Sequence, residues 1–293
     1  MSQINFIDSL YEKVFSDQMQ KKFESFILFA ATIGFIIHLS LIGLNYFKIL
    51  DFGFSEGTLL TNPISAIYTP FSFILVYEIY LLLLYLPRSF STSISKQFEI
   101  VSLIVIRKIF KDIPSMDFGE NWFNSYINLE LLINLIGVLI IFYLIFLFKL
   151  NKKRAPIKTS EVNLKSFIRS KKTVSLILCL ILLFSSVHTF SNWIYDLTLS
   201  YQSHDIVLKD VDDLFFNDFF TYLILTDVVI LLISFKFTMG FSKVLRNTGF
   251  IISTILLRLS FSASQFFDII LILISVTFSL MILKIYNATE NST

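Results

Sequence analysis

The chain has 293 residues, of which 55% are hydrophobic and only 16% are charged, and its formal net charge is +2. Soluble domains are about 45–50% apolar and about 25% charged, so this composition excludes an ordinary soluble domain. The apolar residues form runs of about 20 residues, the length of a membrane-spanning helix. They do not form the alternating segments of about 10 residues that build a membrane β-barrel. The single cysteine, Cys179, excludes a disulfide within the chain.

Residues 1–22 precede the first long apolar run and have the spacing of an amphipathic helix. The apolar positions are Ile4, Phe6, Ile7, Leu10, Tyr11 and Val14, with Asp8, Glu12 and Lys13 between them. Two interpretations are open: a helix that lies on the cytoplasmic membrane surface, or an ordinary structured N-terminus.

Eight apolar segments follow and predict an all-α integral membrane protein with eight transmembrane helices. Their approximate bounds are 23–46, 66–86, 93–112, 129–148, 173–195, 216–235, 245–264 and 267–286. The third segment is the weakest, because it contains Lys96, Glu99, Arg107 and Lys108. The chain then divides into an N-terminal segment (1–22), a four-helix unit (23–150), a linker (151–170), a second four-helix unit (171–287) and a tail (288–293).

The charges between the segments predict the orientation of the chain in the membrane. Residues 151–172 carry eight basic side chains and one acid, Glu161, whereas the loops after the first and fifth segments are acidic. The basic residues are Lys152, Lys153, Arg154, Lys158, Lys165, Arg169, Lys171 and Lys172. Because basic loops stay in the cytoplasm, both termini are predicted to be cytoplasmic.

An internal repeat relates the two four-helix units. The segment 21–38 matches 171–188, the segment 100–107 matches 251–258, and Glu78 corresponds to Asp227, all at offsets of 149 to 151 residues. Each unit has an even number of helices, so both units enter the membrane in the same direction. We therefore expect two parallel repeats related by an axis along the membrane normal.

The most informative polar residues are an acid and an arginine that occur inside apolar segments of both units: Glu78 with Arg107, and Asp227 with Arg258. A charge at mid-membrane costs about 3 kcal/mol or more, so such residues face the interior of a helix bundle and pair. Side chains lean toward the N-terminus of their own helix, and on adjacent antiparallel helices this lean brings acid and arginine together. A direct or water-bridged pair is predicted in each unit, either as a structural ion pair or as part of an ion or proton path or a field-sensing element.

Four further residues are secondary candidates. His38 and His188 occupy matching positions in the first and fifth segments and serve either as hydrogen-bonded helix contacts or as titrating partners of the charged pairs. Glu130 and Asp268 begin the fourth and eighth segments. They are either acids favoured by the helix dipole or alternative partners of the two arginines.

No sequence motif indicates an enzyme or a bound cofactor. Phosphate-binding loops, dinucleotide-binding glycines and the zinc-protease motif are absent from the sequence. The segment 53–57 (GFSEG) has the letters of the nucleophile elbow, but it stands between two apolar segments and not at the strand-to-helix turn that this motif requires. We therefore expect no catalytic residue, no cofactor and no metal ligand.

The second unit combines Asp227, the segment 245–261 (LRNTGFIISTILLRLSF), Asp268 and the closing segment 285–287 (IYN). Through these residues it resembles the phosphate-starvation-inducible E (PsiE) family of bacterial membrane proteins. The first unit is similar through Glu78, the segment 98–110 and Glu130. The resemblance implies a bacterial inner-membrane location and a four-helix unit, which here would be doubled.

Together these features predict a multi-span membrane protein that conducts or senses ions or protons through its acid/arginine pairs. The alternative is a non-conducting scaffold or signalling subunit, in which the ion pairs are structural. Its basic linker, residues 151–172, would recruit a partner or anionic lipid. A homo-oligomer is left open by the sequence, and no nucleic acid is expected as a partner.

Overall fold

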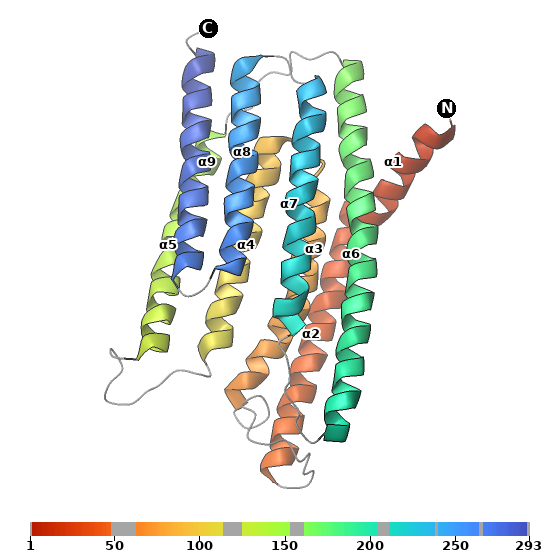
Figure 1. The fold of residues 1–293 in the computed structure, drawn as a ribbon, viewed down its shortest axis with the longest axis vertical. Helices are drawn as coiled ribbons and strands as arrows, with labels where there is room; N and C mark the ends of the chain where they lie inside the picture. The colour runs from red at the N-terminus through yellow and green to blue at the C-terminus, as the bar shows by residue number, and fades with distance from the viewer. Residues whose placement is uncertain are drawn as a thin grey trace.

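The structure is a computed structural model that describes residues 2–47, 63–113, 125–152, 161–203, 211–237, 240–263 and 266–291. Within these ranges all regular structure is helical (Figure 1). The elements are α1 (Ser2–Phe15), α2 (Asp17–Tyr46), the short 3₁₀ helix η1 (Pro63–Ile67), α3 (Tyr68–Tyr85), α4 (Phe90–Asp112), α5 (Tyr126–Asn151), α6 (Glu161–Ser203), α7 (Val211–Phe237), α8 (Phe241–Leu259), the short 3₁₀ helix η4 (Ser260–Ser262) and α9 (Phe267–Asn291).

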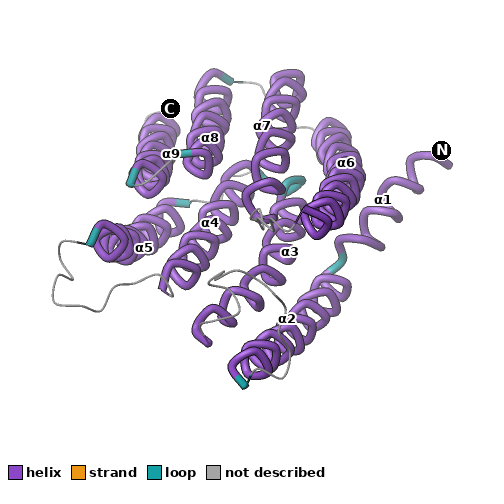
Figure 2. Tube along the Cα trace, turned by 60° about the horizontal axis from the view of Figure 1, so that its bottom comes forward, coloured by secondary structure: helices purple, strands orange, loops and turns teal. Residues whose placement is uncertain are grey.

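The eight long helices lie in two rows (Figure 2). One row contains α2, α3, α4 and α5, and the other contains α6, α7, α8 and α9; within each row, consecutive helices pack together. Contacts between the rows join α5 to α9, α4 to α8 and α3 to α6. Helix α1 lies at the edge of the bundle and packs against α6 and α2.

Corresponding helices of the two rows run in the same direction (Figure 1): α2 with α6, α3 with α7, α4 with α8 and α5 with α9. The first helix and the end of α9 lie toward the same end of the bundle. The order and direction of the helices agree with a parallel internal repeat, which stays a prediction.

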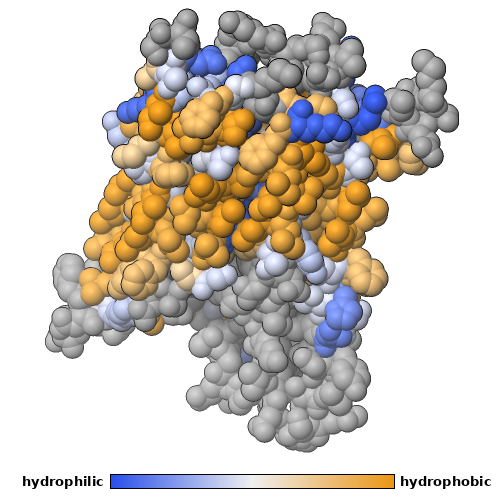
Figure 3. Space-filling model, turned by 45° about the horizontal axis from the view of Figure 1, so that its top comes forward, coloured by the Kyte–Doolittle hydropathy of each residue, from blue (hydrophilic) through white to orange (hydrophobic). Residues whose placement is uncertain are grey.

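Large apolar side chains cover the outside of the bundle. Figure 3 shows them as a band around the middle of the visible face, with hydrophilic side chains gathered at one end. Phe184 is 77% exposed, Leu180 68% and Leu139 64%, although soluble proteins rarely expose continuous apolar patches of this kind. Among the described residues, seven helical stretches are long and apolar enough to cross a membrane. These helices are compatible with a multi-pass membrane protein.

Helix α4 is the long helix that does not meet this standard of length and apolarity. It carries the charged residues that lower the apolarity of the third segment. Helices α3, α5 and α8 pack against it. Phe98, Val101 and Val105 pack toward α5, α8 and α9, whereas Ile100 and Ile104 belong to the apolar core beneath α3, α6 and α7. A helix shielded from lipid in this way does not need the apolar surface of an outer helix. Eight spans therefore remain a prediction.

Two boundaries differ from those expected. Helix α6 begins at Glu161, so the second part of the expected linker is helical; residues 153–160 lie outside the described residues. The N-terminal segment 1–22 is divided at Ser16, whose hydroxyl accepts a hydrogen bond from the Met19 N–H at 3.2 Å and caps α2. Helix α1 buries Tyr11 and Phe15, and the Tyr11 hydroxyl donates to the Leu84 carbonyl at 3.0 Å. This packing favours the structured N-terminus of the two interpretations.

The contact between α5 and α9 depends on Gly137. A Cβ atom at this position would lie 2.3 Å from Cγ1 of Ile269, so either the Ile269 side chain would have to change its conformation or the two helices would have to move apart. We expect Gly137→Ala to lower the free energy of unfolding by about 1–3 kcal/mol, the usual cost of overpacking. Gly43→Ala is the matched control, because a Cβ there meets nothing within 4 Å and should slightly stabilise the helix. Thermal unfolding measures both variants, and equal melting temperatures would contradict the close α5–α9 packing.

Candidate functional site

The charged pair of the second unit is a direct contact in the structure. The carboxylate oxygen Oδ2 of Asp227 on α7 lies 2.7 Å from Nη1 of Arg258 in the last turn of α8. The two side chains are 5% and 3% exposed. Nη2 of Arg258 has no hydrogen-bond partner among the described residues. The structure thus contains a buried ion pair that leaves part of the guanidinium unused.

The charged residues of the first unit are also buried. Glu78 on α3 is 1% exposed and Arg107 on α4 is 6% exposed. Since α3 and α4 are consecutive, packed helices, both side chains face the interior of the bundle, as expected from the cost of placing charge against lipid.

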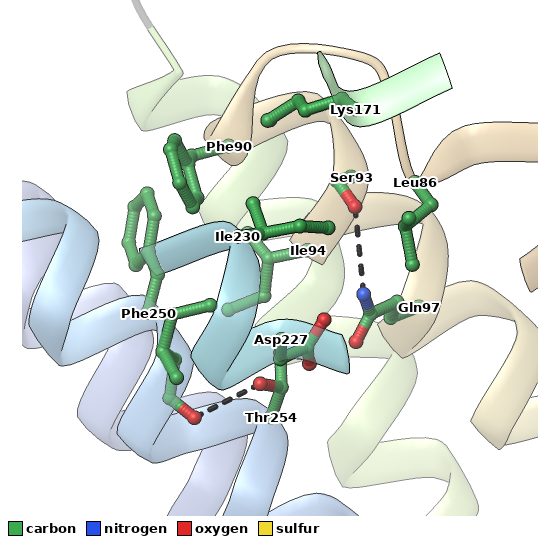
Figure 4. Close-up of a pocket in the computed structure, with 11 residues that line it drawn as sticks. Leu86, Phe90, Ser93, Ile94, Gln97, Lys171, Asp227, Ile230, Phe250 and Thr254 are labelled. Carbon is green, nitrogen blue, oxygen red and sulfur yellow. Dashed lines mark hydrogen bonds between the residues drawn. The ribbon is translucent and has the colours of Figure 1, made fainter. Parts of the chain in front are cut away.

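A small cavity with both apolar and polar side chains in its lining lies between the rows, next to Asp227. Its volume is about 20 Å³, enough for one water molecule. The lining comes from both units (Figure 4): Leu86, Phe90, Ser93, Ile94, Gln97, Lys171, Asp227, Ile230, Phe250, Ile251 and Thr254. Lys171 and Asp227 lie toward opposite ends of the cavity, with Ile94 and Ile230 between them.

Lys171 is the functional candidate that the sequence did not single out. It is 2% exposed, and its Nζ donates a hydrogen bond to the Arg88 carbonyl at 2.9 Å. The ammonium lies 4.1 Å from the ring centroid of Phe90 and 4.9 Å from that of Phe167. In the sequence it stands in a run of basic residues, where a solvated position is the ordinary expectation.

A helical stripe in the sequence could have identified Lys171. Lys171, Ser175, Leu178 and Leu182 follow the spacing of one helix face, and all four are buried in α6. Ser175 Oγ donates to the Leu83 carbonyl at 2.9 Å, which anchors that face of α6 to the end of α3. The adjacent Lys172 lies on another face, where it pairs with Asp8 at 2.8 Å.

The histidines do not belong to this site. His38 on α2 is half-buried, and its Nδ1 lies 2.5 Å from the hydroxyl of Thr69 on α3. His188 is exposed on α6, and its Nδ1 lies 3.4 Å from the amide nitrogen of Asn192. Neither lines the cavity. The structure therefore supports the helix-contact interpretation for His38 and does not bring either histidine to the cavity or to the Asp227–Arg258 pair.

Glu130 and Asp268 contact a lysine rather than the arginines. Lys108 Nζ on α4 lies 3.0 Å from Oε1 of Glu130 and 2.6 Å from Oδ2 of Asp268. Pairing of these acids with the arginines, considered from the sequence, does not occur at Arg258, which contacts Asp227. Lys108 follows Arg107 directly but points toward α5 and α9. One cation thus holds three helices from both rows.

Among the described residues, no group of three or more His, Cys, Asp or Glu side chains could hold a metal ion. The fold and its buried charges define a helical bundle compatible with a multi-pass membrane protein. No protein-family model, no curated protein and no solved structure matches the chain.

Proposed function

We propose that this protein conducts or senses protons or other small cations within the membrane, and that the Asp227–Arg258 pair is its central charged group. The observation that carries the proposal is the burial of this pair, 2.7 Å apart, beside a water-sized cavity between the two rows that Lys171, Gln97 and Thr254 also line. Glu78 and Arg107 form the corresponding group of the first unit.

A buried pair costs desolvation energy, and apolar residues of similar size are often equally or more stabilising. Charges inside membrane proteins therefore commonly mark ion or proton pathways. Asp227 lines the cavity together with polar groups of both rows, so a small relative movement of the rows changes the surroundings of the carboxylate. Exchange of its partner would then open or close a path.

Proton movement into liposomes tests the proposal. A pH gradient is imposed across liposomes containing the purified protein, and its decay is followed with an enclosed pH-sensitive dye. We expect wild type to dissipate the gradient faster than protein-free liposomes and Glu78→Gln to slow the decay at equal amounts of folded protein. Glu12→Gln removes an exposed acid and should leave the rate unchanged. A wild-type rate equal to that of protein-free liposomes would refute proton conduction.

The alternative is a non-conducting scaffold or signalling subunit, and the direct 2.7 Å contact of Asp227 with Arg258 favours it, because such a pair can serve as a structural link between α7 and α8. Asp8 of α1 contacts Arg169 at 3.4 Å and Lys172 at 2.8 Å, so these two basic side chains are paired within the bundle. In this case residues 151–172 would recruit anionic lipid or a partner. Reversal of the charges at 152–154 should then reduce the anionic phospholipid that copurifies; unchanged lipid content would remove this support.

We also propose four features that rest on the amino-acid sequence alone. These are a bacterial inner-membrane location, cytoplasmic termini, a parallel repeat and relation of each unit to the PsiE family. They are supported by the basic residues of 151–172, by the matched segments 100–107 and 251–258, and by Asp227 with Asp268.

A further inference from the structure

Three charged residues of consecutive helices in one row lie around the cavity: Lys171 on α6, Asp227 on α7 and Arg258 on α8. Lys171 and Asp227 line it, and Arg258 contacts Asp227 from outside. All three are less than 10% exposed. With every group ionised, this cluster has two positive charges and one negative charge in a region of low dielectric constant. Such an excess charge is costly.

Loss of one proton would remove the excess charge, and the chemistry of the three groups determines where it is lost. Arginine does not deprotonate in proteins. The Asp227 carboxylate is needed by Arg258, because a buried guanidinium without its partner is strongly destabilising. Lysine, by contrast, readily changes protonation state when it is buried. Lys171 is therefore the group of this cluster that can bind and release a proton.

The surroundings of Lys171 support both of its protonation states. The rings of Phe90 and Phe167 and the Arg88 carbonyl stabilise the ammonium, whereas burial favours the neutral amine. Asp227 is the charged side chain that lines the same cavity as Lys171. On the α1 side, Arg169 and Lys172 are already paired with Asp8.

The rest of the cavity lining offers polar groups to a water molecule. Ser93 and Gln97 belong to α4. The amide nitrogen of Gln97 donates a hydrogen bond to the Ser93 hydroxyl at 3.4 Å. From α8 comes Thr254, whose hydroxyl donates to the Ile251 carbonyl at 2.9 Å. A buried water needs two to four polar partners, and about 20 Å³ is room for one.

We infer that Lys171 is the proton-binding residue of this cavity, and that it exchanges its proton with one water molecule in the cavity. Nζ gives its proton to the water as the water releases a proton to solvent, the amine keeps the electron pair, and Asp227 stays ionised against Arg258. This inference deepens the proposed function and rests on it for its biological meaning. The binding of the proton can be tested without any transport.

The first experiment measures melting temperature against pH for the full-length protein in detergent. Unfolded lysine stays protonated to about pH 10, so stability rises with pH wherever folded Lys171 has already lost its proton. Relative to Lys171→Met, the wild-type melting temperature should rise by about 3 °C per pH unit within the range between neutral pH and about pH 10. Lys172→Met, which changes the neighbouring lysine, should keep the wild-type profile.

Lys171→Arg, which cannot lose its charge, should show no pH-dependent difference from Lys171→Met. A constant difference between wild type and Lys171→Met across this pH range would overturn the inference. If neither variant folds, Phe90→Leu provides the test, because it keeps the lysine and removes one ring from the ammonium. Its profile should then shift to lower pH relative to wild type, and an unshifted profile would also overturn the inference.

Flux in liposomes separates this inference from the proposed function. If wild type shows the pH-dependent stability but no flux, Lys171 binds a proton and conduction is refuted. If wild type shows flux, Lys171→Met should abolish it while Lys172→Met does not. Full flux in folded Lys171→Met would overturn the role of Lys171 and leave the proposed function standing.

Discussion

Asp227→Asn is expected to cause the largest loss of stability of any single change considered for this chain. The substitution leaves Arg258 3% exposed with its charge uncompensated, because Asp227 is the partner of its guanidinium. Breaking a buried pair from one side costs about 3–5 kcal/mol. Thermal unfolding and the yield of monodisperse protein in detergent measure the effect.

The control for this prediction removes both charges. Asp227→Leu combined with Arg258→Met replaces the pair by apolar groups of comparable size, which is often neutral or stabilising. The double variant should therefore recover most of the stability lost in Asp227→Asn. If the double variant is as unstable as the single one, the two side chains do not form the pair that the structure shows.

Lys108→Met is expected to cause the second large effect. It removes the cation shared by Glu130 and Asp268 and leaves two carboxylates near each other at 19% and 16% exposure. Hydrogen bonds to charged groups contribute about 1.5–3 kcal/mol each, and the partial exposure of Lys108 reduces this, so we expect a loss of about 2 kcal/mol. The measurement is thermal unfolding in detergent.

Two comparisons make the Lys108 prediction specific. Lys284→Met removes an exposed lysine from α9 and should leave the melting temperature nearly unchanged. Adding Glu130→Gln and Asp268→Asn to Lys108→Met should restore stability, since the repulsion between the acids is then gone. A triple variant no more stable than Lys108→Met would show that the three residues do not act as one cluster.

The arrangement of the helices follows closely from the apolar pattern. Each of the eight segments corresponds to one long helix, because membrane-length runs of apolar residues leave few alternatives. Helix ends were less predictable. The polar start of α6 from Glu161 carries no apolar run, and its first turns become helical as a continuation of the helix that follows.

The lean of side chains along their helices predicts a direct or water-bridged pair of Asp227 and Arg258, and the structure contains the direct contact. The same reasoning does not predict the contacts of Lys108, which adjoins Arg107 and pairs with Glu130 and Asp268. The partner of Glu130 and Asp268 depends on how the two rows pack, because the acids lie on α5 and α9, which contact each other across the rows. Contacts between distant segments of this kind are not encoded in local spacing.

Residue type alone predicted neither the burial of Lys171 nor the position of the two histidines outside the site. Lys171 was grouped with solvated linker lysines, although its helix face is continuous with Ser175 and Leu178, which are buried. The matched positions of His38 and His188 suggest titrating partners of the charged pairs, yet His38 contacts Thr69 and His188 is exposed. Position relative to the buried stripe of a helix is therefore more informative than residue type or duplication.

The buried charges around the cavity are proposed to move or sense protons and not only to stabilise the helix bundle. The most direct test is the decay of a pH gradient in liposomes that contain the folded double variant Asp227→Leu/Arg258→Met. We expect wild type to dissipate the gradient and liposomes with the folded double variant to behave like protein-free liposomes. Equal rates for wild type and the double variant would contradict it.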